Sequence, residues 1–263
     1  MSALFRSFER NHYGRDWVVG DIHGCFYMLD RLLDRAGFDR HCDRLFSLGD
    51  LIDRGPDSER ALAYLDEPWF HAIRGNHEQM LLDSVRHGGD LQRLWQVNGG
   101  EWFAELSPWH QETFTAYCSA LPLAAEVELH DGRRAGLAHA DVPDDWADVV
   151  DGLTGDTVTP ELANRLLWQR ERATEIERRD RGLLWRRRRR PIVVHGIDLV
   201  LFGHTPMSAP TRCENTRWLD TGAFMGRRLT VAELALDGCV WSLASDLDHC
   251  SDQWRCVVSD RRR

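Results

Sequence analysis

Polar side chains that can bind metal ions stand directly after short apolar runs of this chain, and the pattern recurs along its length. The runs are residues 17–19, 45–48, 69–73, 135–138 and 192–203, and the groups that follow them are Asp21, His23, Asp50, Asn76, His77, His139 and His204. Each run has the composition of a buried strand. Oxygen and nitrogen ligands delivered from several strand ends are what a two-metal hydrolytic centre requires. The chain is therefore predicted to carry such a centre at the edge of a sheet.

A helical pattern follows each of the first three runs. Apolar residues recur at helical spacing over residues 26–36, 61–65 and 80–85, and glycines stand where the first and third helices are expected to end. Three successive strand–helix units predict a largely parallel sheet with right-handed crossovers. Ligands collect at the carboxyl ends of strands in such sheets, which is where Asp21, Asp50 and Asn76 fall.

The pattern changes after Pro122. Residues 124–130 and 135–139 predict a β-hairpin, and residues 193–203, 217–221 and 229–236 predict later strands. These strands predict a second sheet that packs on the first with helices outside, so the predicted fold class is α/β. The tryptophan-rich residues 91–121 look helical, and we interpret them as packing beneath the site. The catalytic domain is expected to span residues 1–236, and residues 237–263 form a C-terminal extension without a predicted structure.

One charged segment interrupts the second half of the chain. Residues 171–191 are expected to form an exposed loop, which contains five consecutive arginines at 186–190. One hypothesis is that these arginines attract acidic substrates to the rim of the site. The alternative is a solvated loop away from the site.

Composition excludes several classes of protein. The 263 residues, 43% of them hydrophobic, are enough for a sizeable core. No apolar run approaches the ~20 residues of a membrane span, so we expect a cytoplasmic protein without a membrane partner. The net charge of −9 disfavours a general nucleic-acid binder. Seven scattered cysteines are expected to be reduced, and a zinc site built from His249, Cys250 and Cys256 lacks a full set of four ligands.

Phosphate ester hydrolysis is the chemistry that this set of ligands suits. The uncatalysed reaction is very slow because a nucleophile must approach an anion while an alkoxide leaves. Two cations about 3.5–4 Å apart convert a bridging water to hydroxide and neutralise the phosphoryl oxygens. Mixed oxygen and nitrogen ligation favours manganese or iron over a thiolate zinc site. The sequence thus predicts a metal-dependent phosphoesterase.

The motifs, taken in order, resemble those of the PPP-type serine/threonine phosphatases within the calcineurin-like metallophosphoesterases. They are most similar to the compact phage lambda-type and bacterial phosphoprotein phosphatases. The resemblance runs from Trp17 to Leu236 and includes residues 20–25, 49–55, 74–80, 98–100, 139–141, 168–172, 202–206 and 220–223. It implies a metallophosphoesterase fold of two packed mixed β-sheets flanked by helices.

The resemblance also implies a ligand set for two divalent metal ions. One ion would be held by Asp21, His23 and Asp50, and the other by Asp50, Asn76, His139 and His204. Mn²⁺ is the expected metal, with iron, nickel or zinc as alternatives. Glu78, by contrast, is expected to stabilise the first turn of its helix, where negative charge complements the helix dipole.

Catalytic roles follow from the same resemblance. His77 would be the general acid that protonates the leaving alkoxide, and Asp53 would orient it. Three arginines would bind phosphoryl oxygens bidentately, namely Arg54, Arg74 and Arg170. Arg172 lies on nearly the same face of any local helix as Arg170, so the register of the third arginine stays open.

The activity implied is hydrolysis of phosphoserine and phosphothreonine in proteins by direct attack of a metal-bridging hydroxide. Phosphotyrosine, the oligomeric state and the physiological phosphoprotein are left open. The main alternative is a symmetrical bis(5′-nucleosyl)-tetraphosphatase, although that family typically has glutamine in place of His23 and aspartate in place of Glu78. A further alternative is a catalytically silent protein or a nucleic-acid adaptor that uses residues 186–190. The complete ligand set opposes silence.

Overall fold

The computed structural model describes residues 4–155, 157–180, 192–245, 250–251 and 253–256. The helices are α1 (Phe26–Ala36), α2 (Arg60–Leu65), α3 (Asn76–His87), α4 (Gly89–Val97), η1 (Gly100–Glu105), α5 (Pro108–Ala120), α6 (Trp146–Thr154), α7 (Pro160–Trp168), α8 (Glu171–Asp180) and η2 (Ala223–Met225). The strands are β1 (Phe5–Phe8), β2 (Asp16–Val19), β3 (Arg44–Ser47), β4 (Phe70–Ala72), β5 (Ala124–Glu128), β6 (Arg134–Ala138), β7 (Leu199–Phe202), β8 (Thr211–Cys213), β9 (Thr216–Trp218), β10 (Arg228–Glu233), β11 (Val240–Ala244), β12 (Cys250–Ser251) and β13 (Arg255–Cys256).

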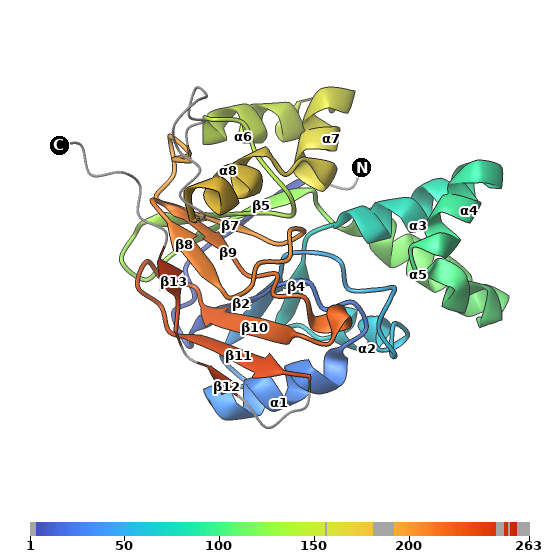
Figure 1. The fold of residues 1–263 in the computed structure, drawn as a ribbon, viewed down its shortest axis with the longest axis horizontal. Coiled ribbons are helices and arrows are strands. Elements are labelled where there is room, and N and C mark those ends of the chain that lie inside the picture. The colour runs from blue at the N-terminus through green and yellow to red at the C-terminus, as the bar shows by residue number, and fades with distance from the viewer. Residues whose placement is uncertain (1–3, 156, 181–191, 246–249, 252, 257–263) are drawn as a thin grey trace.

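These strands form two mixed sheets. One has the order β12-β11-β10-β2-β3-β4, and the other has the order β1-β5-β6-β7-β9-β8-β13. Figure 1 shows the sheets between α1 and α2 on one side and α6, α7 and α8 on the other. The predicted α/β fold of two packed sheets with helices outside is therefore confirmed.

The alternation of side chains between the two faces of each strand explains the layers of the hydrophobic core. In β2, Trp17 and Val19 face the helices α1 and α2, whereas Val18 faces the second sheet. The inner layer between the sheets also takes Phe46 from β3 and Leu137 from β6. Successive side chains of a strand point to opposite faces, so each sheet contributes apolar residues to two layers of core.

The three predicted strand–helix units are present. Strands β2, β3 and β4 are parallel neighbours, and each is followed by one of the helices α1, α2 and α3. Gly37 ends α1 in the left-handed conformation, with φ of 64°. The segments after β2, β3 and β4 consequently emerge at one edge of the sheet, where the predicted ligands lie.

The strands predicted after Pro122 do not all belong to the second sheet, because residues 228–233 form β10, which pairs antiparallel with β2 of the first sheet. The second sheet itself also departs from the prediction. The hairpin of β5 and β6 is confirmed, but β7 begins only at Leu199 rather than near residue 193. The Asn215 side chain bonds both the N–H and the C=O of Val194, which removes those groups from a strand ladder. Strand β1 was not predicted; it is a short edge strand with two exposed residues, so its sequence lacks an apolar signal.

The expectation of an exposed loop over residues 171–191 is wrong for its first part, because residues 171–180 form α8. The helix buries Ala173 and Ile176 against the second sheet. It also buries Arg172, which is 1% exposed and bonds Asp141 and the carbonyl oxygen of Val142. The buried face is partly ionic, so a search for apolar periodicity misses it. The five arginines at 186–190 lie outside the described residues.

A helical arm made of α3, α4, η1 and α5 projects from one end of the sheets (Figure 1). Its inner side is aromatic, with Trp95, Phe103 and Phe114 buried in the core beside α3. Residues 91–121 are thus helical as predicted, in three separate pieces. The arm stands beside the strand ends that hold the predicted site.

The described part of the C-terminal extension joins both sheets. Strand β11 pairs with β10 antiparallel, and β13 pairs with β8 parallel. The domain boundary at residue 236 stays a prediction, as does the fragment of a zinc site, because His249 lies outside the described residues. Six cysteines of the described residues are free thiols, namely Cys25, Cys42, Cys118, Cys213, Cys239 and Cys256. Among the described residues, no helix is long and apolar enough to cross a membrane.

Candidate active site

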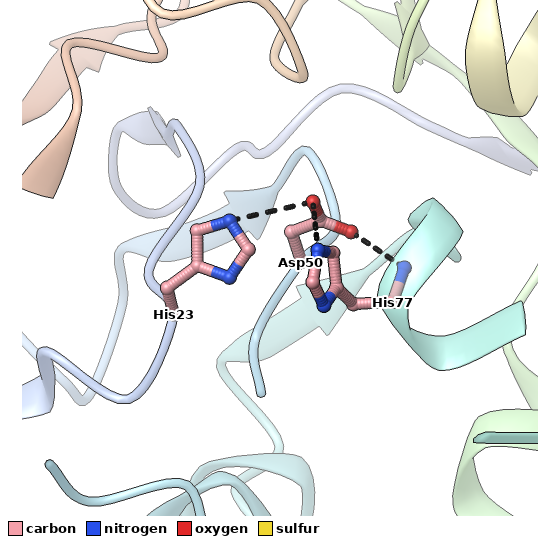
Figure 2. A group of neighbouring side chains, drawn as sticks. All are labelled: His23, Asp50 and His77. Atoms are coloured by element: carbon pink, nitrogen blue, oxygen red, sulfur yellow. Dashed lines mark hydrogen bonds and ion pairs between the residues drawn. The ribbon is translucent and has the colours of Figure 1, made fainter. Parts of the chain in front are cut away.

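The carboxylate of Asp50 lies between two histidines at the edge of the first sheet (Figure 2). Its Oδ2 is 3.5 Å from Nε2 of His23 and 4.0 Å from Nε2 of His77. His23 comes from the loop after β2, Asp50 from the loop after β3, and His77 from the start of α3. All three are at most 2% exposed. The strand ends therefore bring these predicted site residues together.

A second group of side chains meets at Asp50, with His139 and His204 from the ends of β6 and β7 in the other sheet and Asn76 from the start of α3. Nε2 of His139 is 3.5 Å from Oδ1 of Asp50 and 2.9 Å from Oδ1 of Asn76. Nδ1 of His204 is 2.8 Å from the same oxygen of Asn76. The ligand atoms of Asp50, His139 and His204 lie within 4.8 Å of one another. Asp50 thus belongs to both groups, as a bridging ligand must.

Hydrogen bonds from the far side of each ring determine which nitrogen faces the site. His23 and His139 donate from Nδ1 to the carbonyl oxygens of Ile52 and Leu48, over 2.9 and 2.7 Å. Nε2 of His204 lies 3.2 Å from the carbonyl oxygen of Trp168. A carbonyl oxygen can only accept, so the ring nitrogens that face the site have lone pairs rather than protons.

Burial keeps these imidazoles neutral. It lowers the pKa of His23 to about 3 and of His204 to about 2, and it also lowers the pKa of His139. Lone pairs of His139 and His204 therefore converge on the carbonyl oxygen of Asn76 with no proton between them. Three electron-rich atoms at this spacing fit a cation, because a cation is what each of them can bind.

Several buried carboxylates also require a cation nearby. Asp21, Asp50, Glu78 and Asp220 are all at most 3% exposed. Burial, followed by the charges of Asp220 and Asp50, raises the pKa of Asp21 well above its ordinary value. Burial also raises the pKa of Asp220 to about 6. A concentration of buried negative charge costs free energy unless cations compensate it, so the residues present fit a metal centre.

The backbone at the site is unusual. Six described residues other than glycine have positive φ, and five of them are predicted site residues: His23, Asp50, Asp53, Arg54 and His204. Such conformations cost free energy and are concentrated at functional sites. Gly75 and Gly203 permit the close packing around them, because a Cβ would lie 2.2 Å from Oδ1 of Asp50 and 2.1 Å from Oδ1 of Asp21, respectively.

His77 and Asp53 form a fully buried pair beside this centre. Nδ1 of His77 donates to Oδ2 of Asp53 over 2.7 Å. Nε2 of His77 is buried and has no hydrogen-bond partner among the described residues. Burial lowers the pKa of His77, but the charges of Asp50 and Asp53 outweigh it and raise the pKa above its ordinary value. The ring is therefore suited to donate a proton from Nε2.

Two tryptophans hold Asp53, and they belong to a segment whose predicted role is packing alone. Trp95 donates from Nε1 to Oδ2 of Asp53 over 2.6 Å, and Trp102 donates from Nε1 to Oδ1 over 2.8 Å. These indoles come from α4 and η1 of the helical arm. No local spacing connects them with Asp53, so only their abundance in the sequence was a signal.

Glu78 was expected to act on its helix alone, and its contacts extend further. Its Oε2 accepts from the N–H groups of Gly75 and Asp50 over 2.8 and 3.0 Å, and its Oε1 accepts from Leu51 N–H over 2.8 Å. The fully buried carboxylate thereby joins the start of α3 to the loop that holds Asp50. A glutamate three residues after a helix cap predicts the first contact only.

The arginines predicted to bind phosphate differ in their contacts. Nη1 of Arg54 lies 3.4 Å from Nε2 of His23, and its guanidinium lies over the ring of Phe224. Arg170 is exposed beside the second sheet, whereas Arg172 is buried and bonded to Asp141. Arg170 is therefore the exposed one of the two arginines, and its binding to phosphate stays a prediction.

Arg74 is tied to the helical arm. It is 8% exposed and donates from Nη2 to the carbonyl oxygens of Ser119 and Leu121, over 2.8 and 3.1 Å. Its Nη1 donates to Gln79 over 3.1 Å. Its binding to phosphate stays a prediction, while these bonds join the start of α3 to the end of α5.

Two mixed sheets flanked by helices, with carboxylate, imidazole and amide side chains gathered at their strand ends, have the architecture of a metallophosphoesterase. A family model described as calcineurin-like phosphoesterase matches residues 15–208. Serine/threonine-protein phosphatase 1 of Salmonella typhimurium is 38% identical over 237 residues, covering 88% of this chain and 97% of the relative. The symmetrical bis(5′-nucleosyl)-tetraphosphatase of Pseudomonas fluorescens is 30% identical over 161 residues, covering 54% of this chain and 51% of the relative.

A solved structure shares the fold. It is a protein serine/threonine phosphatase from Saccharomyces cerevisiae, with a TM-score of 0.58, 15% identity and coverage of 94% of this chain and 85% of that one. The chain therefore belongs to the calcineurin-like phosphoesterase family, and the predicted family is confirmed. It is a hydrolase of a metal-dependent family whose centres typically hold two ions.

Proposed function

We propose that this protein removes phosphate from phosphoserine and phosphothreonine residues of proteins. The main support is the buried Nε2 of His77, which lies 4.0 Å from Oδ2 of Asp50 while Nδ1 is held by Asp53. Asp50 belongs to the metal-ligand cluster, which consists of the predicted ligands Asp21, His23, Asp50, Asn76, His139 and His204. A serine or threonine alkoxide is a poor leaving group, and it gains most from a positioned proton donor. The similarity to serine/threonine-protein phosphatase 1 extends over 97% of that protein, which also favours this substrate class.

We propose two sites for divalent ions, with Mn²⁺ as the expected metal. Asp21, His23 and Asp50 would hold one ion, and Asp50, Asn76, His139 and His204 would hold the other. When bound, the ions would supply the nucleophile and neutralise the phosphoryl oxygens. Arg54 and Arg170 would orient the phosphoryl group from the surface, and His77 would protonate the leaving oxygen from Nε2.

Cleavage of dinucleoside polyphosphates is the second candidate function. The match to a symmetrical tetraphosphatase supports it, although that match spans about half of each chain. The two candidates differ in the group that leaves, because a phosphate ester of serine releases an alkoxide and a polyphosphate releases a phosphate. His23 and Glu78 favour the protein phosphatase. The symmetrical tetraphosphatases typically have glutamine at the position of His23 and aspartate at the position of Glu78.

The deciding experiment uses metal-free enzyme reconstituted with manganese, nickel, iron or magnesium. Each form is offered phosphoserine, phosphothreonine and phosphotyrosine peptides beside diadenosine tetraphosphate. We expect the manganese enzyme to hydrolyse phosphoserine and phosphothreonine peptides with the highest kcat/KM. A higher kcat/KM for diadenosine tetraphosphate than for every phosphopeptide would reject the proposal in favour of the second candidate.

A further inference from the structure

A polar pocket of about 590 Å³ adjoins the metal-ligand cluster. Its wall combines parts of α8, the loop after β7, the turn before β10 and strand β13. The charged residues that line it are Arg170, Glu177, Arg227 and Arg255. The volume falls within the range of small-ligand sites. None of the roles assigned above uses this pocket beyond Arg170.

The pocket and the cluster share neighbouring residues. Arg170 lines the pocket and lies two residues after Trp168, whose carbonyl oxygen is 3.2 Å from Nε2 of His204. Thr205, which also lines the pocket, directly follows His204. A phosphoryl group held at the cluster by Arg170 would therefore have the pocket immediately beside it.

Hydrogen bonds fix one charged side chain of the wall and the backbone of another. Arg255 donates from Nη1 to Ser208 over 2.9 Å and from Nε to Thr211 over 3.1 Å. The backbone of Arg227 is bonded on both sides, through its N–H to Gly222 and through its C=O to Ser245. Its side chain is exposed. The Thr205 hydroxyl is buried without a hydrogen-bond partner among the described residues.

Charge identifies the class of ligand. Three guanidinium groups and one carboxylate, Glu177, line the pocket, although the whole chain has a net charge of −9. Guanidinium groups bind phosphates and carboxylates through paired N–H donors. A locally cationic wall on an acidic protein favours an anion over a neutral or cationic group.

We propose that this arginine pocket binds a second anionic group of the substrate whose phosphoryl group occupies the metal centre. The proposal rests on the proposed phosphatase function. The second group is a phosphate or an acidic side chain close in sequence to the phosphorylated residue. Arg227 and Arg255 contact this group, and Glu177 limits its charge. The pocket thereby selects substrates with clustered negative charge.

The test compares three peptides of one sequence that contain a phosphoserine. The neighbouring position is alanine in the first, aspartate in the second and a second phosphoserine in the third. Wild-type enzyme is expected to show the highest kcat/KM on the third peptide. In Arg227→Gln, kcat/KM should fall about fivefold to tenfold on the third peptide and little on the first, because only one charge-assisted contact is lost. The difference should shrink at high salt, which screens exposed charges.

Two further variants give the sign of the effect. Arg228→Gln removes the charge of the adjacent residue, which begins β10 and does not line the pocket, and should leave the order of the peptides unchanged. Glu177→Gln removes the negative charge from the wall and should raise kcat/KM on the third peptide relative to the first. Opposite shifts from Arg227→Gln and Glu177→Gln are not expected from general destabilisation.

Competition makes the result independent of peptide turnover. The same peptides are measured as inhibitors of aryl phosphate hydrolysis, which needs no protein substrate. If no peptide is hydrolysed but the doubly phosphorylated one inhibits most and loses this preference in Arg227→Gln, the pocket stands and the proposed function fails. Equal inhibition of the wild type by all three peptides would contradict the proposal that the pocket binds a second anionic group. Equal effects of Arg227→Gln and Arg228→Gln would contradict it as well.

Discussion

On the metal side of the active site, His23 and His139 are oriented by two carbonyl oxygens of the loop that follows β3. On the acid side, His77 is oriented by the carboxylate of Asp53, which in turn is held by Trp95 and Trp102 of the helical arm. The first arrangement uses backbone groups close to the ligands in the fold. The second is a relay of side chains that crosses from the sheet to the arm.

This difference predicts two kinds of functional defect. Changes on the metal side should reduce hydrolysis of every phosphate ester, because the ions act on the phosphoryl group itself. Changes on the acid side should reduce hydrolysis in proportion to how much the leaving group needs a proton. Comparing a phosphopeptide with an activated aryl phosphate therefore separates the two sides.

Asp50→Asn should have the largest effect, since Asp50 is the one predicted ligand shared by both metal sites. The fold should persist, because the amide oxygen can still accept from the N–H of His77, as Oδ1 does over 3.0 Å. Turnover of both substrates is expected to fall to background. Kinetics, circular dichroism and elemental analysis of bound metal check this. Full activity in the folded variant, or in wild-type enzyme after thorough chelation, would contradict the two-metal centre.

His77→Asn should have a large effect that depends on the substrate. Turnover of phosphopeptides is expected to fall by ~10²–10⁴-fold, the usual contribution of a general acid, while bound metal is retained. The loss on an activated aryl phosphate should be smaller because its leaving group needs less protonation. Losses of equal size on the two substrates would remove the assignment of His77 as the acid.

Glu78→Gln should weaken metal binding while leaving the chemistry intact. An amide cannot accept all three backbone N–H bonds of Glu78, so the loop of Asp50 loses part of its support. We expect metal affinity to fall by roughly 10–100-fold, as for other groups that orient a ligand. At saturating metal, turnover of both substrates should recover equally. Metal titrations of activity test this, and Glu105→Gln, an exposed glutamate of η1, is the control.

The contrast between the two sides also explains what the sequence could predict. The ligands of the metal side follow buried strands, so apolar runs locate Asp50 and His139 and parallel pairing brings the first sheet's ligands together. The support of the acid side comes from 42 and 49 residues further along the chain, through Trp95 and Trp102. An indole that packs and an indole that donates a hydrogen bond look alike in a sequence.

The fold shows the same limit. Strands buried on both faces, such as β2, are visible as apolar runs, whereas α8 is hidden because Arg172 takes a core position through its bonds to Asp141 and Val142. The edge strand β1 gives no pattern because two of its four residues are exposed. Segments stabilised by polar contacts at long sequence separation are therefore the ones that periodicity misses.

Trp102→Phe should have the smallest effect, and it tests whether the helical arm acts through the acid. Phenylalanine keeps an aromatic ring beside Phe103 and Phe114 but removes the N–H that Asp53 accepts. Trp95 still donates to Asp53, so we expect turnover of phosphopeptides to fall only about 3–10-fold, with a smaller loss on the aryl phosphate. Steady-state kinetics on both substrates measure this.

A double variant and a matched control decide how the loss arises. Trp109→Phe changes a tryptophan of the same arm that is 67% exposed, and it should leave both activities unchanged. If Trp102 acts by holding Asp53 and through it His77, then Trp102→Phe should cause no further loss in a His77→Asn background, because contacting residues of one relay are not additive. A further loss of the same size in that background would mean that the arm supports the metal side as well, and the division between the two sides would fail.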